Sequence, residues 1–190
     1  MNLIVEIGRL KLKNPVMSAS GTFGYAEEFS DFVDLNKLGA IVVKGISIKP
    51  MGGNPPPRIC ETACGMLNSI GLQNVGLKKF LKEKLPYLNK LKTIIIVNIL
   101  GNSISDYVKL SKTLEDSGIE AVELNVSCPN VKKGGIAFGI NDKMLAKLIS
   151  KVRQSAQKIT LITKLSPNVS NIPLFAKVAE DSGSDAISLI

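Results

Sequence analysis

Short apolar runs alternate along the chain with segments of helical period, and this alternation sets the predicted elements. Runs bounded by turn residues predict strands at 15–19, 40–43, 93–98, 121–124, 159–164 and 185–190. Apolar residues at helical spacing predict helices at 27–36, 76–89, 105–117, 142–155 and 172–182. Residues 3–12 alternate around Gly8 and Arg9, which predicts a short hairpin placed as a plug across the bottom of a barrel. The long segment 47–74 is predicted to be irregular, and loops of that length are usually functional.

The predicted strands are apolar throughout, and helices separate them. That pattern is typical of a parallel sheet buried on both faces and joined by helical crossovers. The first strand is not followed by a GxGxxG motif, which disfavours a dinucleotide-binding fold. Polar residues instead follow strand after strand, at the edge where barrel enzymes bind their ligands: Ser20, Lys44, Asn98, Asn125 and Lys164. We therefore predict the α/β class, as a (β/α)8 TIM barrel in a single domain over residues 1–190.

The length bears on this prediction. A complete (β/α)8 barrel takes about 250 residues, and the 190 residues here supply roughly the first five to six βα units. We expect the N-terminal portion of a truncated barrel, with an open sheet edge and low stability. The absent part would include the loops after strands seven and eight, which commonly bind phosphate in such barrels.

Composition removes several classes of function. The chain has no histidine, which excludes Ser-His-Asp and Cys-His catalysis and the usual zinc ligand. Its three cysteines (Cys60, Cys64 and Cys128) form no disulfide framework. The net charge of +8 permits nucleic-acid binding, but the lysines are dispersed and only 5% of residues are aromatic, so we favour a solvated surface and no nucleic-acid partner. No apolar run is long enough for a membrane span, and no signal peptide is present, so we expect a cytoplasmic protein without membrane association.

Cys128 is the candidate for chemistry. It lies just beyond the predicted strand 121–124, where Pro129 must end the sheet ladder, and it is flanked by Asn125 and Asn130. A thiol with a pKa near 8.5 serves as a base where its surroundings favour the thiolate. A buried, inert cysteine is the commoner alternative. The position at a strand end favours the catalytic interpretation.

Five motifs occur in order along the whole chain: SASGTFG, VKGIS, NSIGLQN, NVSCPN followed by KKGGIAFG, and KLSPN. Together they resemble the dihydroorotate dehydrogenase family, and most closely its class 1B, the FMN-containing catalytic subunits linked to NAD. The resemblance implies oxidation of (S)-dihydroorotate to orotate in de novo pyrimidine (UMP) biosynthesis, with FMN accepting hydride and Cys128 as the base. It also implies a partner subunit that carries FAD and a 2Fe-2S cluster and passes electrons to NAD, in a heterotetramer built on a homodimer.

The same resemblance assigns the binding residues. Asparagine offers a donor and an acceptor to a ring of alternating carbonyl and N–H groups, and a fixed lysine stabilises the negative charge of reduced flavin. The predicted FMN contacts are Ala19, Ser20, Gly21, Lys44, Asn98, Asn125, Lys164 and Ile190. The predicted substrate contacts are Lys44, Asn68, Ile70, Gly71, Leu72, Asn125 and Asn130. Taken singly, such an asparagine is a turn residue or cap, and such a lysine extends to the barrel rim.

No metal site is predicted, because Cys60 and Cys64 lack further ligands; both are interpreted as structural, with Arg58 and Glu61 holding the long loop. Three alternatives stay open. One is a dihydropyrimidine dehydrogenase-like flavoprotein that acts on uracil-type rings. Another, favoured by the positive charge, is a tRNA dihydrouridine synthase-like flavoenzyme that binds RNA. The third is that these 190 residues alone are an inactive fragment.

Overall fold

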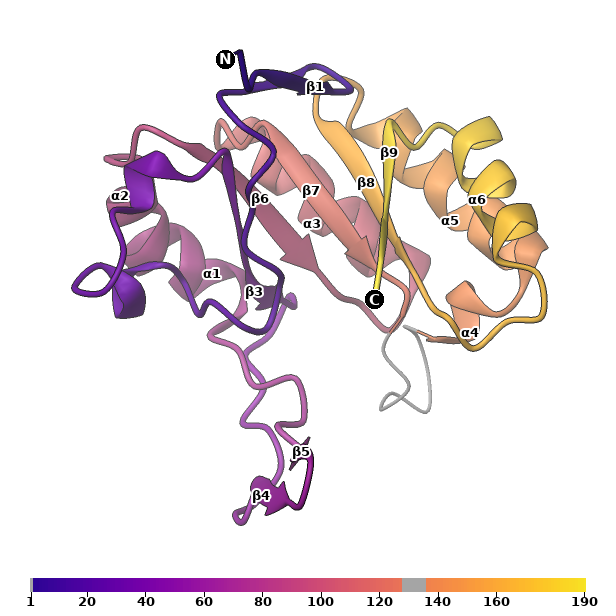
Figure 1. Cartoon of the computed structure of the whole chain (residues 1–190). Helices are drawn as coiled ribbons and strands as arrows, with labels where there is room; N and C mark the ends of the chain where they lie inside the picture. Colours follow the sequence, from indigo (N-terminus) through magenta and orange to yellow (C-terminus); the bar gives the residue numbers. More distant parts are fainter. Residues whose placement is uncertain (1, 128–135) are drawn as a thin grey trace.

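Five parallel strands form the central sheet of the protein (Figure 1). The computed structural model describes residues 2–127 and 136–190. The strands lie in chain order, so that each pairs with the one before it and the order never reverses. A sheet wound in one direction is typical of a barrel, whereas a doubly wound sheet has a switch point. The strands are β3 (Ala40–Ile46), β6 (Ile94–Ile99), β7 (Ala121–Asn125), β8 (Thr160–Leu165) and β9 (Ala186–Leu189).

Helices connect these strands and cover the outer face of the sheet (Figure 1). The predicted helix 76–89 is confirmed, although it contains a π-helical turn at Phe80–Lys84 between its two α-helical parts. Among the residues that the structure describes, no helix is long and apolar enough to cross a membrane. The α-helices are α1 (Gly76–Lys79), α2 (Leu85–Leu88), α3 (Ile104–Asp116), α4 (Ile136–Gly139), α5 (Asp142–Ser155) and α6 (Ile172–Asp181).

Side-chain caps fix where the longer helices begin. Ser103 and Asp106 form a reciprocal capping box at the start of α3. Asn141 accepts a hydrogen bond from the Met144 N–H at 2.9 Å at the start of α5. Such caps satisfy N–H groups that have no partner within the helix, at a gain of about 1 kcal/mol each. They explain why the sequence located these helices closely.

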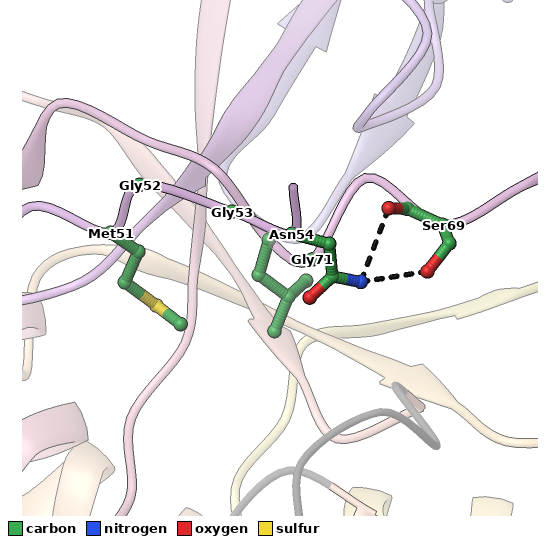
Figure 2. Close-up of a pocket in the computed structure, with 7 residues that line it drawn as sticks. Met51, Gly52, Gly53, Asn54, Ser69 and Gly71 are labelled. Atoms are coloured by element: carbon green, nitrogen blue, oxygen red, sulfur yellow. Dashed lines mark hydrogen bonds between the residues drawn. The ribbon is translucent and has the colours of Figure 1, made fainter. Parts of the chain in front are cut away.

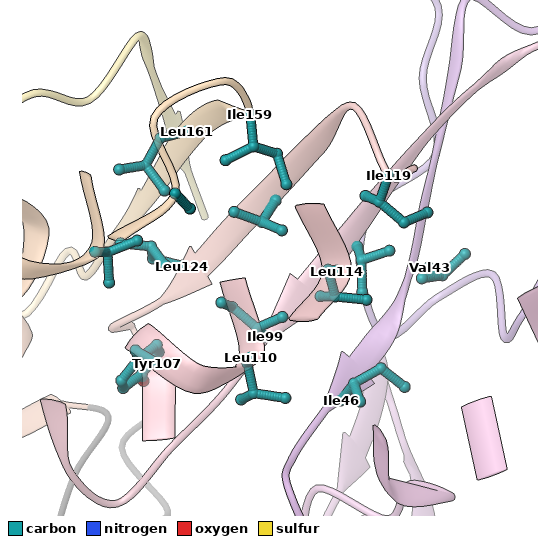
Figure 3. Close-up of a cluster of buried hydrophobic side chains, with 14 of the residues drawn as sticks. Val43, Ile46, Ile99, Tyr107, Leu110, Leu114, Ile119, Leu124, Ile159 and Leu161 are labelled. Atoms are coloured by element: carbon teal, nitrogen blue, oxygen red, sulfur yellow. The ribbon is translucent and has the colours of Figure 1, made fainter. Parts of the chain in front are cut away.

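The main hydrophobic core lies between the sheet and its helices (Figure 3). Leu124 and Leu161, from the outward face of the strands, pack in it with Tyr107, Leu110 and Leu114 of α3. All five side chains are fully buried. Complete burial of a large apolar side chain contributes about 1.5–3 kcal/mol, so this layer holds the helices to the sheet.

A smaller core occupies the inner face of the sheet, at the end where the strands begin. The predicted hairpin is confirmed there, as β1 (Val5–Ile7) paired antiparallel with β2 (Leu10–Leu12). Leu10 and Leu12 are buried against inward residues of the strands, among them Val42, Ile96 and Ile162. The hairpin lies across this end of the sheet, as predicted for a plug (Figure 1).

Two predicted elements near the N-terminus are wrong. Residues 15–19 do not form a buried strand: Met17 makes a single parallel bridge to Ala40 and is 40% exposed. The Ser18 hydroxyl takes the place of further ladder bonds by bonding the Val42 N–H and carbonyl. Residues 27–36 do not form one helix but two 3₁₀ turns, at Glu27–Phe29 and Leu35–Lys37. Asp34 explains the break, because its side chain accepts from the Asn36 N–H and starts the second turn.

The segment 47–74 is more regular than predicted. It contains an antiparallel hairpin of β4 (Ile59–Thr62) and β5 (Gly65–Asn68), which projects beyond the carboxyl ends of the central strands as an arm (Figure 1). All eight residues of its two strands are exposed. The pattern therefore lacks the polar and apolar alternation that marks a half-buried strand.

Candidate functional site

A cavity of about 600 Å³ opens at the carboxyl ends of the central strands. Its volume falls within the range of small-molecule sites, about 300–1,000 Å³. Neighbouring strands each supply a polar side chain to it: Lys44 from β3, Asn98 from β6, Asn125 from β7 and Lys164 from β8. The four strands thus supply two ammonium groups and two amides to the cavity.

Most of the predicted site residues come together at this cavity. Ala19 is not among its lining residues, and its carbonyl instead accepts from Thr22 in a turn. Cys128 and Asn130 lie outside the described residues. Four lining residues were not predicted: Gly45, Gln73, Leu100 and Ser127. The predicted residues that line the cavity are Ser20, Gly21, Lys44, Asn68, Ile70, Gly71, Leu72, Asn98, Asn125, Lys164 and Ile190.

The position of Lys44 differs from the prediction. The sequence placed it after a strand that ended at residue 43, whereas β3 continues through Lys44 to Ile46 with a register shift after Val43. Such an irregularity redirects side chains within a strand. Gly45 lies within the stretch where the register shifts. A Cβ at this position would lie 2.8 Å from Asn98 Oδ1. Glycine therefore keeps the space above that amide open.

Hydrogen bonds join the polar groups of the cavity. Lys164 Nζ donates to Ser20 Oγ at 3.2 Å, which links β8 to the loop at residue 20. Asn125 Nδ2 donates to Asn98 Oδ1 at 3.4 Å, and Ser127 Oγ donates to Asn125 Oδ1 at 3.2 Å. The polar side chains are thereby held in place before any ligand arrives.

Two participants in this network were missed by the sequence interpretation. Glu123 of β7 accepts from Asn98 Nδ2 at 2.5 Å, and Ser188 of β9 donates to the other carboxylate oxygen at 2.7 Å. Glu123 is 5% exposed. One acidic residue inside the apolar run 121–124 was the available signal, because a buried carboxylate needs a reason.

The loop 70–72 forms the side of the cavity nearest the arm. Leu72 has φ = 57°, a left-handed conformation that is strained for a residue with a branched side chain. The buried Asn74 side chain holds the loop, since its Nδ2 donates to the Leu72 carbonyl at 3.0 Å and its Oδ1 accepts from the Ser47 N–H at 3.2 Å. Asn74 thus fastens the two ends of the segment 47–74 to each other.

A second hollow lies at the root of the arm (Figure 2). Within it, Asn54 Nδ2 donates to the Ser69 carbonyl at 3.1 Å and to its hydroxyl at 2.7 Å. Gly71 and Leu72 line both hollows. The root of the arm and the cavity therefore share one loop.

The charged and sulfur-bearing side chains of the arm have distinct positions. Arg58 bonds Gln73 Oε1 at 2.7 Å and the Gly52 carbonyl at 3.1 Å, so it ties the arm to the cavity rim as predicted. Cys60 and Cys64 are exposed with free thiols, so neither packs in a core. Among the described residues, no cluster of three or more histidine, cysteine or acidic side chains could hold a metal ion.

Comparison with known proteins identifies the family. The family model described as dihydroorotate dehydrogenase matches residues 2–190. The chain belongs to this family. Among the relatives of the chain are proteins named as catalytic subunits of dihydroorotate dehydrogenase B (NAD(+)). The one from Thermoanaerobacter sp. is 55% identical over 190 residues, and the one from Bacteroides thetaiotaomicron is 51% identical over 190.

Both alignments cover all of this chain, but 63% and 62% of those two dihydroorotate dehydrogenases, respectively. Among solved structures, the dihydroorotate dehydrogenase of Eimeria tenella in complex with ferulenol superposes with a TM-score of 0.79 at 23% identity. That comparison covers 98% of this chain and 58% of the other. The likeness confirms the predicted fold class, of which the five parallel strands form a part.

Proposed function

We propose that the protein oxidises (S)-dihydroorotate to orotate in pyrimidine biosynthesis, with FMN as the hydride acceptor. The observation that supports this most is the lining of the cavity, where lysines and asparagines from four neighbouring strands face one space. A dihydropyrimidine ring alternates carbonyl and N–H groups, and asparagine amides complement both. The identity of 55% to a protein named as a catalytic subunit of dihydroorotate dehydrogenase supports the same substrate.

The side chains present fit FMN. Bound FMN would supply an acceptor for two electrons and a hydride. Lys164 and Lys44 would favour the negative charge that accumulates on reduction. Gly45 would allow a flat ring to approach the strand closely, because no Cβ fills the space above Asn98. Ser20 and Gly21 would line the same space.

The substrate would bind through the asparagines and the loop 70–72. Asn68, Asn125 and Asn130 would bond the ring, and Lys44 would offset the substrate carboxylate. The Cys128 thiolate would remove the proton from C5 while hydride leaves C6, so that a C=C bond forms and the thiol carries the proton. Residues 1–190 contain no histidine, and Cys128 would supply a base of another kind.

We propose further that residues 1–190 form a single FMN-binding domain that functions in the cytoplasm with a partner subunit. The two relatives described above carry the words "NAD(+)" and "catalytic subunit" in their names. By analogy, electrons would leave the flavin through a subunit that holds FAD and a 2Fe-2S cluster. A homodimer of the catalytic chain within a heterotetramer would be the assembly.

Anaerobic addition of dihydroorotate to the purified full-length protein, with the flavin absorbance followed in time, tests the proposal. Loss of the oxidised flavin band together with formation of orotate is the expected result. Bound flavin that dihydroorotate fails to reduce would refute the substrate, and dihydrouracil would then be the compound to compare. Purified protein that does not bind added FMN would refute the cofactor.

A further inference from the structure

A buried carboxylate lies directly beneath the cavity. Glu123 is 5% exposed, and its two oxygens each receive one hydrogen bond, from Asn98 Nδ2 at 2.5 Å and from Ser188 Oγ at 2.7 Å. Both donors are neutral groups. Burial of a carboxylate with neutral partners costs free energy, and a well-packed apolar residue would commonly be more stable in such a place. Stability of the sheet therefore does not explain Glu123.

The chemistry of the carboxylate fixes the orientation of its neighbour. An ionised carboxylate only accepts hydrogen bonds, so the Asn98 amide must turn its NH₂ group toward Glu123. Its oxygen then points the other way, where it accepts from Asn125 Nδ2 at 3.4 Å. Asn98 is fully buried, so water does not compete for these bonds.

The orientation of Asn98 in turn fixes the orientation of the Asn125 amide. With its NH₂ group held by Asn98, Asn125 turns its own oxygen toward Ser127, whose hydroxyl donates to it at 3.2 Å. Each step allows one orientation, because an amide that donates on one side must accept on the other. A single acceptor-only group at the end of the row thus orders two amides that line the cavity.

We propose that Glu123 is a positioning residue that, through the buried Asn98, sets the donor and acceptor pattern which Asn125 presents to the ligand. Glu123 itself is not among the residues that line the cavity. A ring with alternating donors and acceptors binds one orientation of this amide and is repelled by the reverse. The ring in question is that of the proposed FMN and substrate, so this part of the inference rests on the proposed function. The orientation of the two amides by Glu123 does not depend on the proposed function.

Glu123→Gln tests the proposal with little change in volume. The new amide can donate as well as accept, and the Ser188 hydroxyl can adapt to either group, so the orientation of Asn98 is no longer dictated. Ser188→Ala is the matched control: it removes the other hydrogen bond of Glu123 but leaves an acceptor-only group facing Asn98.

The first measurement is made without ligand, on full-length protein labelled with ¹⁵N at asparagine. Side-chain amide resonances of Asn98 and Asn125 are recorded by NMR. In Glu123→Gln both should shift or split into two sets, although Asn125 does not contact residue 123. In Ser188→Ala both should keep their number and nearly their positions. An Asn125 resonance unchanged by Glu123→Gln would overturn the proposal.

The second measurement is FMN affinity of the apoprotein, from quenching of flavin fluorescence. The dissociation constant should rise about tenfold in Glu123→Gln, the equivalent of one misdirected hydrogen bond of about 1.4 kcal/mol, and less than about twofold in Ser188→Ala. The visible spectrum of the bound flavin should change in Glu123→Gln alone, which a general loss of stability would not cause. Equal effects of the two variants would overturn the positioning role.

The two proposals fail in different ways. Unaltered protein that does not bind FMN would refute the proposed function, while the amide resonances still decide the role of Glu123. If Glu123→Gln does not fold, hydrogen exchange of the Asn98 side-chain amide in the unaltered protein decides instead. Slow exchange of its NH₂ protons is expected, and exchange as fast as that of an exposed asparagine would contradict the proposal.

Discussion

On the inner face of the sheet, the inward side chains of each strand change from apolar to polar over a step of two residues. This change divides the inner face into an apolar half and a polar half. In β6 and β7 the change falls at the same register, whereas in β8 and β9 it falls two residues further along, because Glu123 pairs with Ile162. The outward faces of β3, β6, β7 and β8 stay largely apolar and pack in the main core. The pairs of inward residues, apolar first and polar second, are Val42 and Lys44, Ile96 and Asn98, Ala121 and Glu123, Ile162 and Lys164, and Ala186 and Ser188. Strand propensity does not explain the change from apolar to polar side chains, because both halves belong to the same strand.

What differs is the cover over each half. The hairpin of β1 and β2 closes the apolar half, where Leu10 and Leu12 fill the space between the strands. The polar half faces the cavity. In barrels of this kind the amino ends of the strands contribute stability and the carboxyl ends contribute chemistry. Substitutions in the two halves should therefore affect different measurements.

Cys128→Ser, at the proposed base, should have the largest effect. A hydroxyl is a far weaker base than a thiolate, and a general base contributes about 10²–10⁴-fold to a rate. We expect flavin reduction by dihydroorotate, measured by anaerobic stopped flow at neutral pH, to slow by about 100-fold or more, with an unchanged unfolding midpoint. Cys60→Ser, the same change at an exposed position of the arm, is the control. Similar rates in both variants would remove Cys128 from its proposed role.

Ile96→Ala, in the apolar half, should lower stability and leave ligand binding unchanged. Ile96 is fully buried between the hairpin and the strands. Its truncation should lower the free energy of unfolding by about 2–5 kcal/mol, because a cavity remains. Ile59→Ala, at a position that is 56% exposed, should cost under about 0.5 kcal/mol. Denaturant unfolding measures both, and FMN affinity below the transition should stay unchanged. A loss of FMN affinity in Ile96→Ala without a loss of stability would contradict the assignment of stability to the apolar half and binding to the polar half.

The regular elements were predictable where pattern and capping agree. The helix at 142–155 was located to the residue, because helical periodicity and the Asn141 cap point to the same boundary. The helix predicted at 27–36 failed because the Asp34 cap interrupts a pattern that periodicity alone reads as continuous. The exposed hairpin of β4 and β5 was missed because no buried face imposes alternation on it.

For the candidate site, sequence motifs located the strand-end residues but not their connections. Asn98 and Asn125 were singled out, and both line the cavity. Glu123 and Ser188 were not, because their role depends on which residues lie opposite each other across the sheet. Asn98 pairs with Glu123 in the β6–β7 register, and no local pattern in the sequence encodes that pairing.

Lys164→Ala should have the smallest of the three effects and sharpen the comparison most. Lys164 is half-buried two residues beyond Ile162, on the polar side of the change. Removal of its ammonium should raise the dissociation constant of reduced FMN about tenfold, or about 1.4 kcal/mol, because that charge favours the reduced flavin. Stability should hardly change, because the hydrogen bond from Lys164 to Ser20 is only partly buried. Lys109→Ala on the exposed face of α3 alters the net charge equally and should leave FMN affinity within about twofold, since exposed charges are screened. If both variants weakened FMN alike, the effect would belong to net charge and not to the polar half.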